Sequence, residues 1–142
     1  MNTYRYRRFS ICHPNICDQK VDEQAFRDRT RQLGIRVIRM AAALPQQRAA
    51  DVIARQIIRC ATSVGANYRA ACRARSTADM IAKLGIVLEE ADETLYWLEV
   101  IVETDLLPAA RLADLMQETN AIIAMTVASI KTLRTPDRKP KT

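Results

Sequence analysis

The side chains best suited to bind a metal ion lie together near the N-terminus, as Cys12, His13 and Cys17. Thiolate and imidazole groups bind zinc, but a structural zinc site needs four ligands, and no second pair follows downstream. His13 is also the only histidine of the chain. The sequence therefore predicts neither a metal site nor a cofactor, and we interpret this segment as an unstructured leader.

Two carboxylates, Glu90 and Glu93, have the spacing that places side chains on one face of a helix. Helical bundles can hold a di-iron centre, but that centre requires a Glu-x-x-His pair on each of two helices. A nucleophilic mechanism would likewise need a base, and the predicted helices contain no histidine. We therefore expect that the protein is not an enzyme.

The arginines are better candidates for binding residues than the carboxylates are for catalytic ones, because the planar guanidinium group matches the oxygens of a phosphate. Arg69, Arg73 and Arg75 have few acidic partners at the same level of the bundle. Together with the arginines of the first helix they are the predicted phosphate contacts, and those of the first helix are Arg27, Arg29, Arg31, Arg36 and Arg39. Against nucleic-acid binding, the chain has no recognised nucleic-acid motif and few aromatic residues for base stacking. Tyr68 is the one aromatic candidate near these arginines, and we interpret it instead as an interface residue.

Charge is distributed unevenly along the chain. Residues 1–75 carry 15 basic and 5 acidic side chains, whereas residues 76–142 carry 7 basic and 11 acidic ones. A basic surface could attract nucleic acid through its long-range field. The basic half could instead dock on the acidic half, within one chain or between copies, and both alternatives stay open.

The elements that position these side chains are predicted to be helices. The chain has 142 residues with only 3 glycines and 5 prolines, which disfavours β-sandwiches and glycine-dependent nucleotide-binding folds. No apolar run reaches the roughly 20 residues of a membrane span, and we identify no secretory signal. We expect a cytoplasmic protein in which Cys60 and Cys72 are small, reduced, buried side chains.

Apolar residues recur with steps of three and four in four segments, which are 22–44, 46–74, 76–104 and 108–134. The predicted inward stripes are Phe26, Thr30, Leu33, Val37, Met40 and Leu44; Ile53, Ile57, Cys60, Val64, Asn67, Ala71 and Ala74; Ile81, Leu84, Leu88, Ala91, Leu95, Leu98 and Val102; and Leu112, Leu115, Thr119, Ile122, Thr126, Ser129 and Leu133. This pattern predicts an all-α, antiparallel up-down-up-down four-helix bundle over residues 22–134. Residues 1–21 are predicted to be a flexible leader and residues 135–142 a flexible basic tail.

Local signals mark several helix ends. Asp22 is a predicted N-cap, Pro45 ends the first segment, and Ser76 with Asp79 resembles a capping box. Pro108 suits the first position of the last helix. A stripe of mostly small residues around Gly65 predicts a close approach between the second helix and a neighbour.

A turn centred near Arg75 would place residues whose numbers sum to about 150 at one level of the bundle. This register pairs Arg59 with Glu90, Arg55 with Glu93, and Asn67 with Lys83. We interpret these polar residues as pairs that hold the helices in register, and exposed pairs of this kind contribute only about 0–1 kcal/mol each.

Each predicted helix has more apolar circumference than one core stripe requires, so we expect a homo-oligomer. The predicted interface residues are Ile35, Ile38, Ile58, Tyr68, Ile86, Trp97 and Ile101. An exposed apolar flank that no other copy covered would be a liability in solution.

Several short motifs together resemble one family, that of the small bundle proteins encoded in intervening sequences of bacterial 23S rRNA genes. They are Leu44-Pro45, Gln56, Arg59, Ser63-Val64-Gly65-Ala66-Asn67, Arg75-Ser76, Lys83, Glu90-Ala91, Glu93-Thr94 and Tyr96-Trp97-Leu98. The resemblance covers about residues 36–133. One departure is that Asn67 is followed by Tyr68-Arg69-Ala70-Ala71, where many relatives continue Asn-Ile-Ala-Glu-Gly, so no carboxylate role carries over to Ala70.

The resemblance implies a four-helix protomer that assembles into a homo-pentamer and has no established enzymatic activity. A related group of basic bundles serves reverse transcriptases as nucleic-acid-binding accessory factors, so RNA binding is expected by analogy. The leading hypothesis is a non-catalytic homo-oligomer whose basic surface binds nucleic acid, with RNA as the expected ligand. The alternative is a protein–protein interaction scaffold, an accessory factor to another protein, that binds no nucleic acid.

Overall fold

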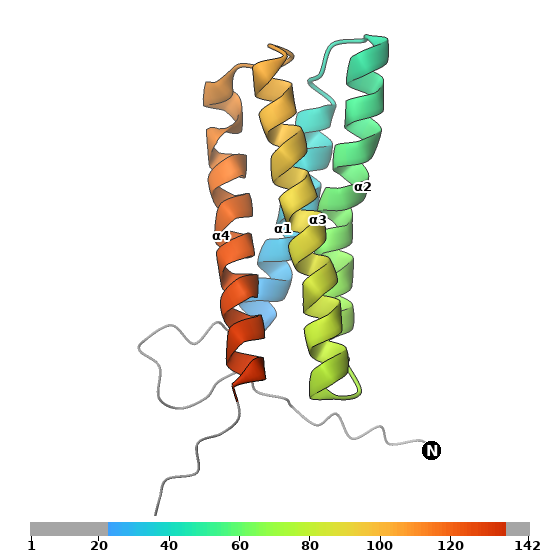
Figure 1. Ribbon diagram of the computed structural model, residues 1–142. Coiled ribbons are helices and arrows are strands. Elements are labelled where there is room, and N and C mark those ends of the chain that lie inside the picture. The colour runs from blue at the N-terminus through green and yellow to red at the C-terminus, as the bar shows by residue number, and fades with distance from the viewer. Residues whose placement is uncertain (1–22, 136–142) are drawn as a thin grey trace, which may run out of the picture.

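The computed structural model describes residues 23–135, which form four helices: α1 (Glu23–Ala41), α2 (Arg48–Ala71), α3 (Thr77–Glu103) and α4 (Ala109–Arg134). Each helix packs against the next, and α1 also packs against α4. Figure 1 shows the chain direction alternating between successive helices, which short turns connect at the two ends of the bundle. The predicted four-helix bundle is thus confirmed for these residues, while the predicted leader and the end of the predicted tail lie outside them.

The core runs along the bundle axis and is aliphatic apart from Phe26 and Tyr68. In α1, α2 and α4 the predicted stripes form it, although Met40, Leu44, Asn67, Ala74, Ser129 and Leu133 are only partly buried. In α3 the buried stripe is rotated about the helix axis relative to the predicted one. Val87 and Ile101 are fully buried, whereas the predicted Leu88 and Val102 are not. Since α3 carries apolar residues on both flanks, its neighbours α2 and α4 decide which of them point inward.

The start of α3 follows the predicted capping pattern. Ser76 Oγ accepts a hydrogen bond from the Asp79 N–H at 3.1 Å, and the Asp79 carboxylate accepts one from the Arg75 N–H at 3.0 Å. These bonds satisfy amides that have no partner in the first helical turn. Pro108 is the N-cap of α4, which begins one residue later than predicted, and the predicted cap Asp22 lies outside the described residues.

The end of α3 is a Schellman motif built on a residue with positive φ. Asp105 has φ of 54°, its N–H donates to the Val102 carbonyl, and the Leu106 N–H donates to the Ile101 carbonyl. This pattern satisfies the last carbonyls of the helix. The chain then turns sharply into α4.

Two glycines let α1 and α2 approach closely. A Cβ atom added at Gly65 would lie 3.2 Å from the Arg31 Cα, and one added at Gly34 would lie 3.2 Å from the Thr62 Cα. Both distances involve backbone atoms, so no side-chain rotation could relieve them. The predicted close approach at Gly65 is confirmed. Among the described residues, no helix is both long and apolar enough to cross a bilayer.

Candidate nucleic-acid interface

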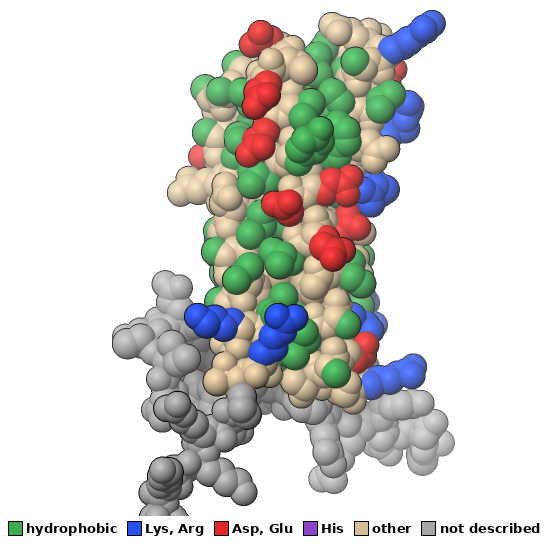
Figure 2. Space-filling model, viewed as in Figure 1, with side chains coloured by type: hydrophobic (Ala, Val, Ile, Leu, Met, Phe, Trp, Pro, Cys, Tyr) green, Lys and Arg blue, Asp and Glu red, His purple; other side chains and the backbone are tan. Residues whose placement is uncertain are grey.

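Opposite charges lie on helices that are diagonal in the bundle. Helix α1 carries five arginines, whereas α3 carries seven acidic residues and one lysine, and within residues 23–135 these two helices do not pack against each other. Figure 2 shows acidic side chains on the face formed by α3 and basic side chains along the edge formed by α2. The protein thus has a basic side, made by α1 and α2, and an acidic side.

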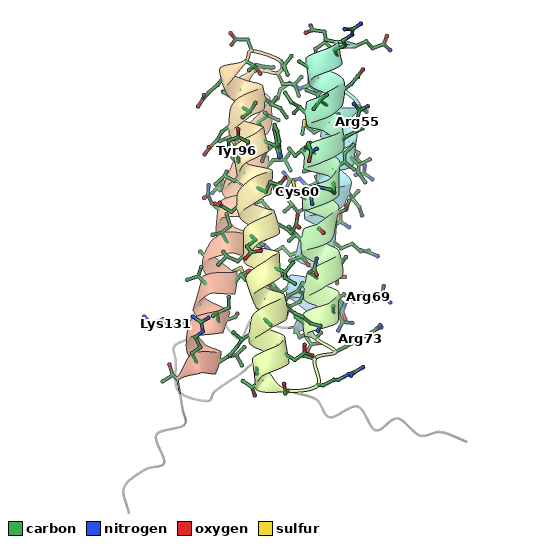
Figure 3. All side chains as sticks on the ribbon, turned by 45° about the vertical axis from the view of Figure 1, so that its right-hand side comes forward. Arg55, Cys60, Arg69, Arg73, Tyr96 and Lys131 are labelled. Carbon is green, nitrogen blue, oxygen red and sulfur yellow. The ribbon has the colours of Figure 1, made fainter. Side chains whose placement is uncertain are left out.

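The predicted phosphate contacts gather mainly at one end of the basic side. Arg69, Arg73, Arg75 and Lys83 line an open hollow of about 680 Å³ where α2 turns into α3. Arg69 and Arg73 also line a groove of about 380 Å³ between α1 and α2, together with Arg27 and Arg31. We call this set, Arg27, Arg31, Arg69, Arg73 and Arg75, the arginine surface. Figure 3 shows Arg69 and Arg73 extending outward from α2.

Four members of the arginine surface have guanidinium groups that no carboxylate holds. Arg31, Arg69, Arg73 and Arg75 are exposed and make no side-chain hydrogen bond or ion pair with any residue in 23–135. Arg27 differs, because its guanidinium binds Glu23 at 2.7 Å. Four cations are therefore available at this surface for an external anion.

Three of the predicted phosphate contacts, Arg29, Arg36 and Arg39, lie elsewhere. Arg36 faces α4, where it lines a hollow with Asp114 and Glu118, so carboxylates share its surroundings. Arg39 is exposed in the last turn of α1, two turns beyond Arg31. Arg36 and Arg39 therefore line neither the hollow nor the groove of the arginine surface, and their phosphate contacts stay a prediction.

Arg29 joins α1 to α4, which sequence reasoning missed. Its guanidinium binds both carboxylate oxygens of Glu118, at 2.5 and 3.0 Å. The two residues are 89 positions apart in sequence, so no local spacing signals the pair. Arg29 is therefore a structural residue in this fold.

Arg59 holds two carboxylates of α3 at once. It binds Glu90 at 3.3 Å and Glu93 at 2.6 Å, which confirms the predicted Arg59–Glu90 pair. Arg59, followed by the Trp97 indole N–H, holds the pKa of the Glu93 carboxyl below its usual range. The predicted Arg55–Glu93 pair is wrong, because Arg59 occupies Glu93, and Arg55 makes no ion pair within residues 23–135.

The predicted Asn67–Lys83 pair is also wrong. The Asn67 amide donates to the Ser63 carbonyl of its own helix at 2.9 Å. Lys83 binds Asp79 at 2.6 Å, and Lys83, followed by the Arg75 N–H, lowers the pKa of Asp79. Each side chain finds a partner within one helical turn, which a level-by-level register cannot anticipate.

Two of the predicted interface residues are core residues. Tyr68 is 2% exposed and Ile101 is 0% exposed. Tyr68 packs edge-on against Phe26 with ring centroids 4.5 Å apart, and burial raises its pKa. The prediction that they contact another copy is wrong, because the α1–α2 and α3–α4 contacts of the protomer already bury them.

The other predicted interface residues remain accessible and lie on two patches. Ile35 and Ile38 line the α1–α2 groove, and Ile58 lies one turn from Thr62, which lines the same groove. Ile86 and Trp97 lie on the flank of α3, where the Trp97 N–H donates to Glu93. Ile38 and Ile86 are 46% and 41% exposed.

Both described cysteines are free thiols, and neither is fully exposed. Cys60 is in the core, where Thr94 Oγ lies 3.3 Å from its sulfur, and burial raises its pKa. Cys72 is half-buried beside Tyr68 and Arg27, and burial raises its pKa as well. Within the described part of the chain, no group of three or more His, Cys, Asp or Glu residues could hold a metal ion. The segment with Cys12, His13 and Cys17 lies outside that part.

Comparisons with known proteins point in one direction. A family model described as "23S rRNA-intervening sequence protein" matches residues 23–128. A crystal structure of a protein with unknown function from the S23 ribosomal protein family of Bacteroides thetaiotaomicron is similar at a TM-score of 0.72 and 32% identity, covering 77% of this chain and 97% of that one. No curated protein matches. The match spans all four helices and includes the arginine surface.

Proposed function

The chain belongs to the 23S rRNA-intervening sequence protein family, and we propose that it is a cytoplasmic, non-catalytic, homo-oligomeric bundle that binds nucleic acid, RNA before DNA. The observation that carries this proposal is the arginine surface, where four exposed arginines form no ion pair within residues 23–135. Asp79 also lines the hollow and interacts with the charge of Arg75 without forming an ion pair with it. Like charges that lie close together repel each other, and phosphates relieve that repulsion while releasing their counterions.

The acidic side of the bundle also favours nucleic-acid binding on the side of the arginine surface. Its exposed carboxylates on α3 include Glu89, Asp92 and Glu99, and they repel a polyanion. Nucleic acid is therefore attracted to α1 and α2 and directed away from α3. The family name concerns rRNA genes, and RNA is accordingly the first ligand to test.

The two apolar patches support assembly of several copies. The patch of Ile35, Ile38 and Ile58 lies on α1 and α2, whereas Ile86 and Trp97 lie on α3. When one patch of a protomer binds the other patch of a second copy, the contact is heterologous, and such contacts form a ring where the rotation between copies closes. We propose a ring of this kind, with the pentamer that the family resemblance implies, in which each copy adds one arginine surface and so increases avidity.

One observation favours the alternative scaffold function. Tyr96 and Val52 are 55% and 48% exposed, and Tyr96 packs edge-on against Trp97 with centroids 5.0 Å apart. Exposed aromatic residues are enriched at protein–protein contacts. A scaffold that only bound another protein could use this surface without any nucleic acid.

Titration of labelled RNA at low and moderate salt separates these functions. We expect binding that weakens steeply as salt rises, and at least a tenfold loss of affinity in the triple variant Arg69→Ala, Arg73→Ala, Arg75→Ala. The matched control is Arg111→Ala, Lys131→Ala, Arg134→Ala, which removes the same charge from α4 and should retain most of the affinity. Absence of RNA binding at low salt, or equal losses in both variants, would refute the proposed interface.

A further inference from the structure

The chemistry of the arginine surface restricts which form of nucleic acid it can bind. Proteins that bind single strands combine a basic groove with aromatic side chains on which bases stack. On the described part of this protein the aromatic side chains lie elsewhere: Phe26 and Tyr68 are buried, and Tyr96 and Trp97 lie on acidic α3. The arginine surface therefore offers charge without a stacking platform.

The arginine surface spans α1, α2 and the α2–α3 turn. Arg69 lies in the last turn of α2 and Arg73 lies in the turn that follows it, and Arg31 stands across the groove on α1. The backbone contact at Gly65, with Arg31 Cα 3.2 Å from an added Cβ, holds the two groove walls together. Cations on two walls whose backbones are held together suit an ordered array of phosphates better than a flexible chain, because ordering a chain costs conformational entropy.

Apolar residues limit the size of the contact. Ile35 and Ile38 line the part of the groove that leads away from Arg31. On the α2–α3 side, the next arginine is Arg59, and its guanidinium group already binds carboxylates. The contact is therefore confined to the end of the bundle near the α2–α3 turn. Four unpaired arginines set the number of phosphates that one protomer can neutralise.

From these features we infer that the ligand of the arginine surface is a double helix, bound through its phosphates without reading the bases. This inference rests on the proposed nucleic-acid-binding function and names the class of ligand. Arg31, Arg69, Arg73 and Arg75 each contact one phosphate. RNA and DNA duplexes share this chemistry, so both are tested.

The experiment measures affinity against salt concentration for the full chain. The probes are a hairpin duplex of about 12 base pairs, roughly one helical turn, as RNA and as DNA, and a single strand of poly(U) with the same number of phosphates. For four phosphates we expect a slope of log K against log salt of about −3.6 per bound protomer, or about 10²-fold weaker binding between 50 and 200 mM salt. We expect weaker binding of the single strand at every salt concentration.

Single variants test the assignment of each arginine. Arg31→Ala, Arg69→Ala, Arg73→Ala and Arg75→Ala should each reduce the magnitude of the slope by about 0.9. Arg29→Gln and Arg59→Gln, whose arginines are held by carboxylates, should leave the slope unchanged. Trp97 is the only tryptophan of the chain, and its fluorescence should stay unquenched by either ligand, because no base stacks beside it.

The outcomes separate this inference from the proposed function. Single strands that bind as tightly as duplexes, or that quench Trp97, would overturn the inference and leave nucleic-acid binding in place. If the variants of the carboxylate-bound arginines changed the slope of log K against log salt as much as the variants of the unpaired arginines, the assigned contacts would be overturned. Failure of every probe to bind at low salt would remove the proposed function and the inference together. A difference between the two duplexes would show which sugar the surface prefers.

Discussion

Arg59 and Arg69 lie on the same helix, yet they differ in what surrounds their guanidinium groups. Arg59 is held by Glu90 and Glu93, whereas Arg69 has no carboxylate partner among residues 23–135. An arginine that already binds carboxylates must lose those bonds before it can bind phosphate. At the scale of single residues, ion pairing therefore divides the arginines into structural and available ones.

The Arg59–Glu93 pair makes stability depend on pH. Because the folded pKa of Glu93 is lowered, its contribution is present above the unfolded pKa and is lost as pH falls through the folded value. We expect Glu93→Gln to lower the thermal midpoint at about pH 7, and the difference from wild type to shrink as pH falls below the unfolded pKa of glutamate, about 4.3. Melting followed by circular dichroism measures it, with Glu99→Gln as the control on the same helix. A difference that stays constant down to acid pH would contradict the assignment.

Two helical glycines should respond oppositely to the same substitution. An added Cβ at Gly85 meets nothing within 4 Å, whereas one at Gly65 lies 3.2 Å from α1 backbone atoms. We expect Gly85→Ala to raise the free energy of unfolding by about 0.5–1 kcal/mol through helix propensity. Gly65→Ala should lower it, because α1 must move. Urea unfolding measures both, and stabilisation by Gly65→Ala would show that the helices can separate without loss.

The elements differ in how their ends are determined. The start of α3 is set by Ser76 and Asp79, whose side chains bind the first free amides. The end of α3 depends on Asp105 adopting φ of 54°, a conformation that costs energy for residues with a Cβ atom. The α2–α3 turn places Arg75 beside Arg69 and Arg73, and so completes the arginine surface of the proposed function.

Glycine at position 105 should stabilise the protein. The left-handed conformation costs glycine little, and the Schellman hydrogen bonds use only backbone atoms. We expect Asp105→Gly to raise the free energy of unfolding by about 0.5–1 kcal/mol, and Asp105→Val to lower it. Chemical denaturation of the two variants and wild type provides the comparison. If glycine destabilised the protein, the Asp105 side chain would have a role that its backbone conformation does not explain.

The whole molecule has a basic side and an acidic side because its helices differ in charge and lie diagonally. One end of the basic side carries the arginine surface, and the remainder carries Ile35 and Ile38. The proposed nucleic-acid binding and the proposed assembly therefore involve adjacent but different residues, so single variants can separate them.

Assembly is tested by a matched pair of exposed residues. Ile38 and Val127 are both 46% exposed, but only Ile38 belongs to a predicted interface patch. We expect light scattering to give a multiple of 16.1 kDa for wild type, a smaller mass for Ile38→Glu, and an unchanged mass for Val127→Glu. Both variants should keep their helicity, since surface substitutions change stability little. A wild-type mass of one protomer across micromolar concentrations would refute the homo-oligomer.

Much of the fold was predictable because it depends on local chemistry. The steps of three and four identified the four helices, Pro45 and Ser76 marked two of their boundaries within a few residues, and Gly65 signalled the close approach to α1. These features act over one or two turns of helix, and a sequence displays them directly. The Arg59–Glu90 pair was predictable too, since one short turn sets the register of α2 against α3.

Only the tertiary structure decided which side chains of each helix point inward and which arginines are free. Tyr68 and Ile101 lie in the core, Arg36 faces α4, and Arg29 binds Glu118 across 89 positions. Each outcome depends on how far a helix is rotated about its own axis against its neighbours. That rotation minimises the exposed apolar surface of all four helices at once, so no single segment of the sequence contains it.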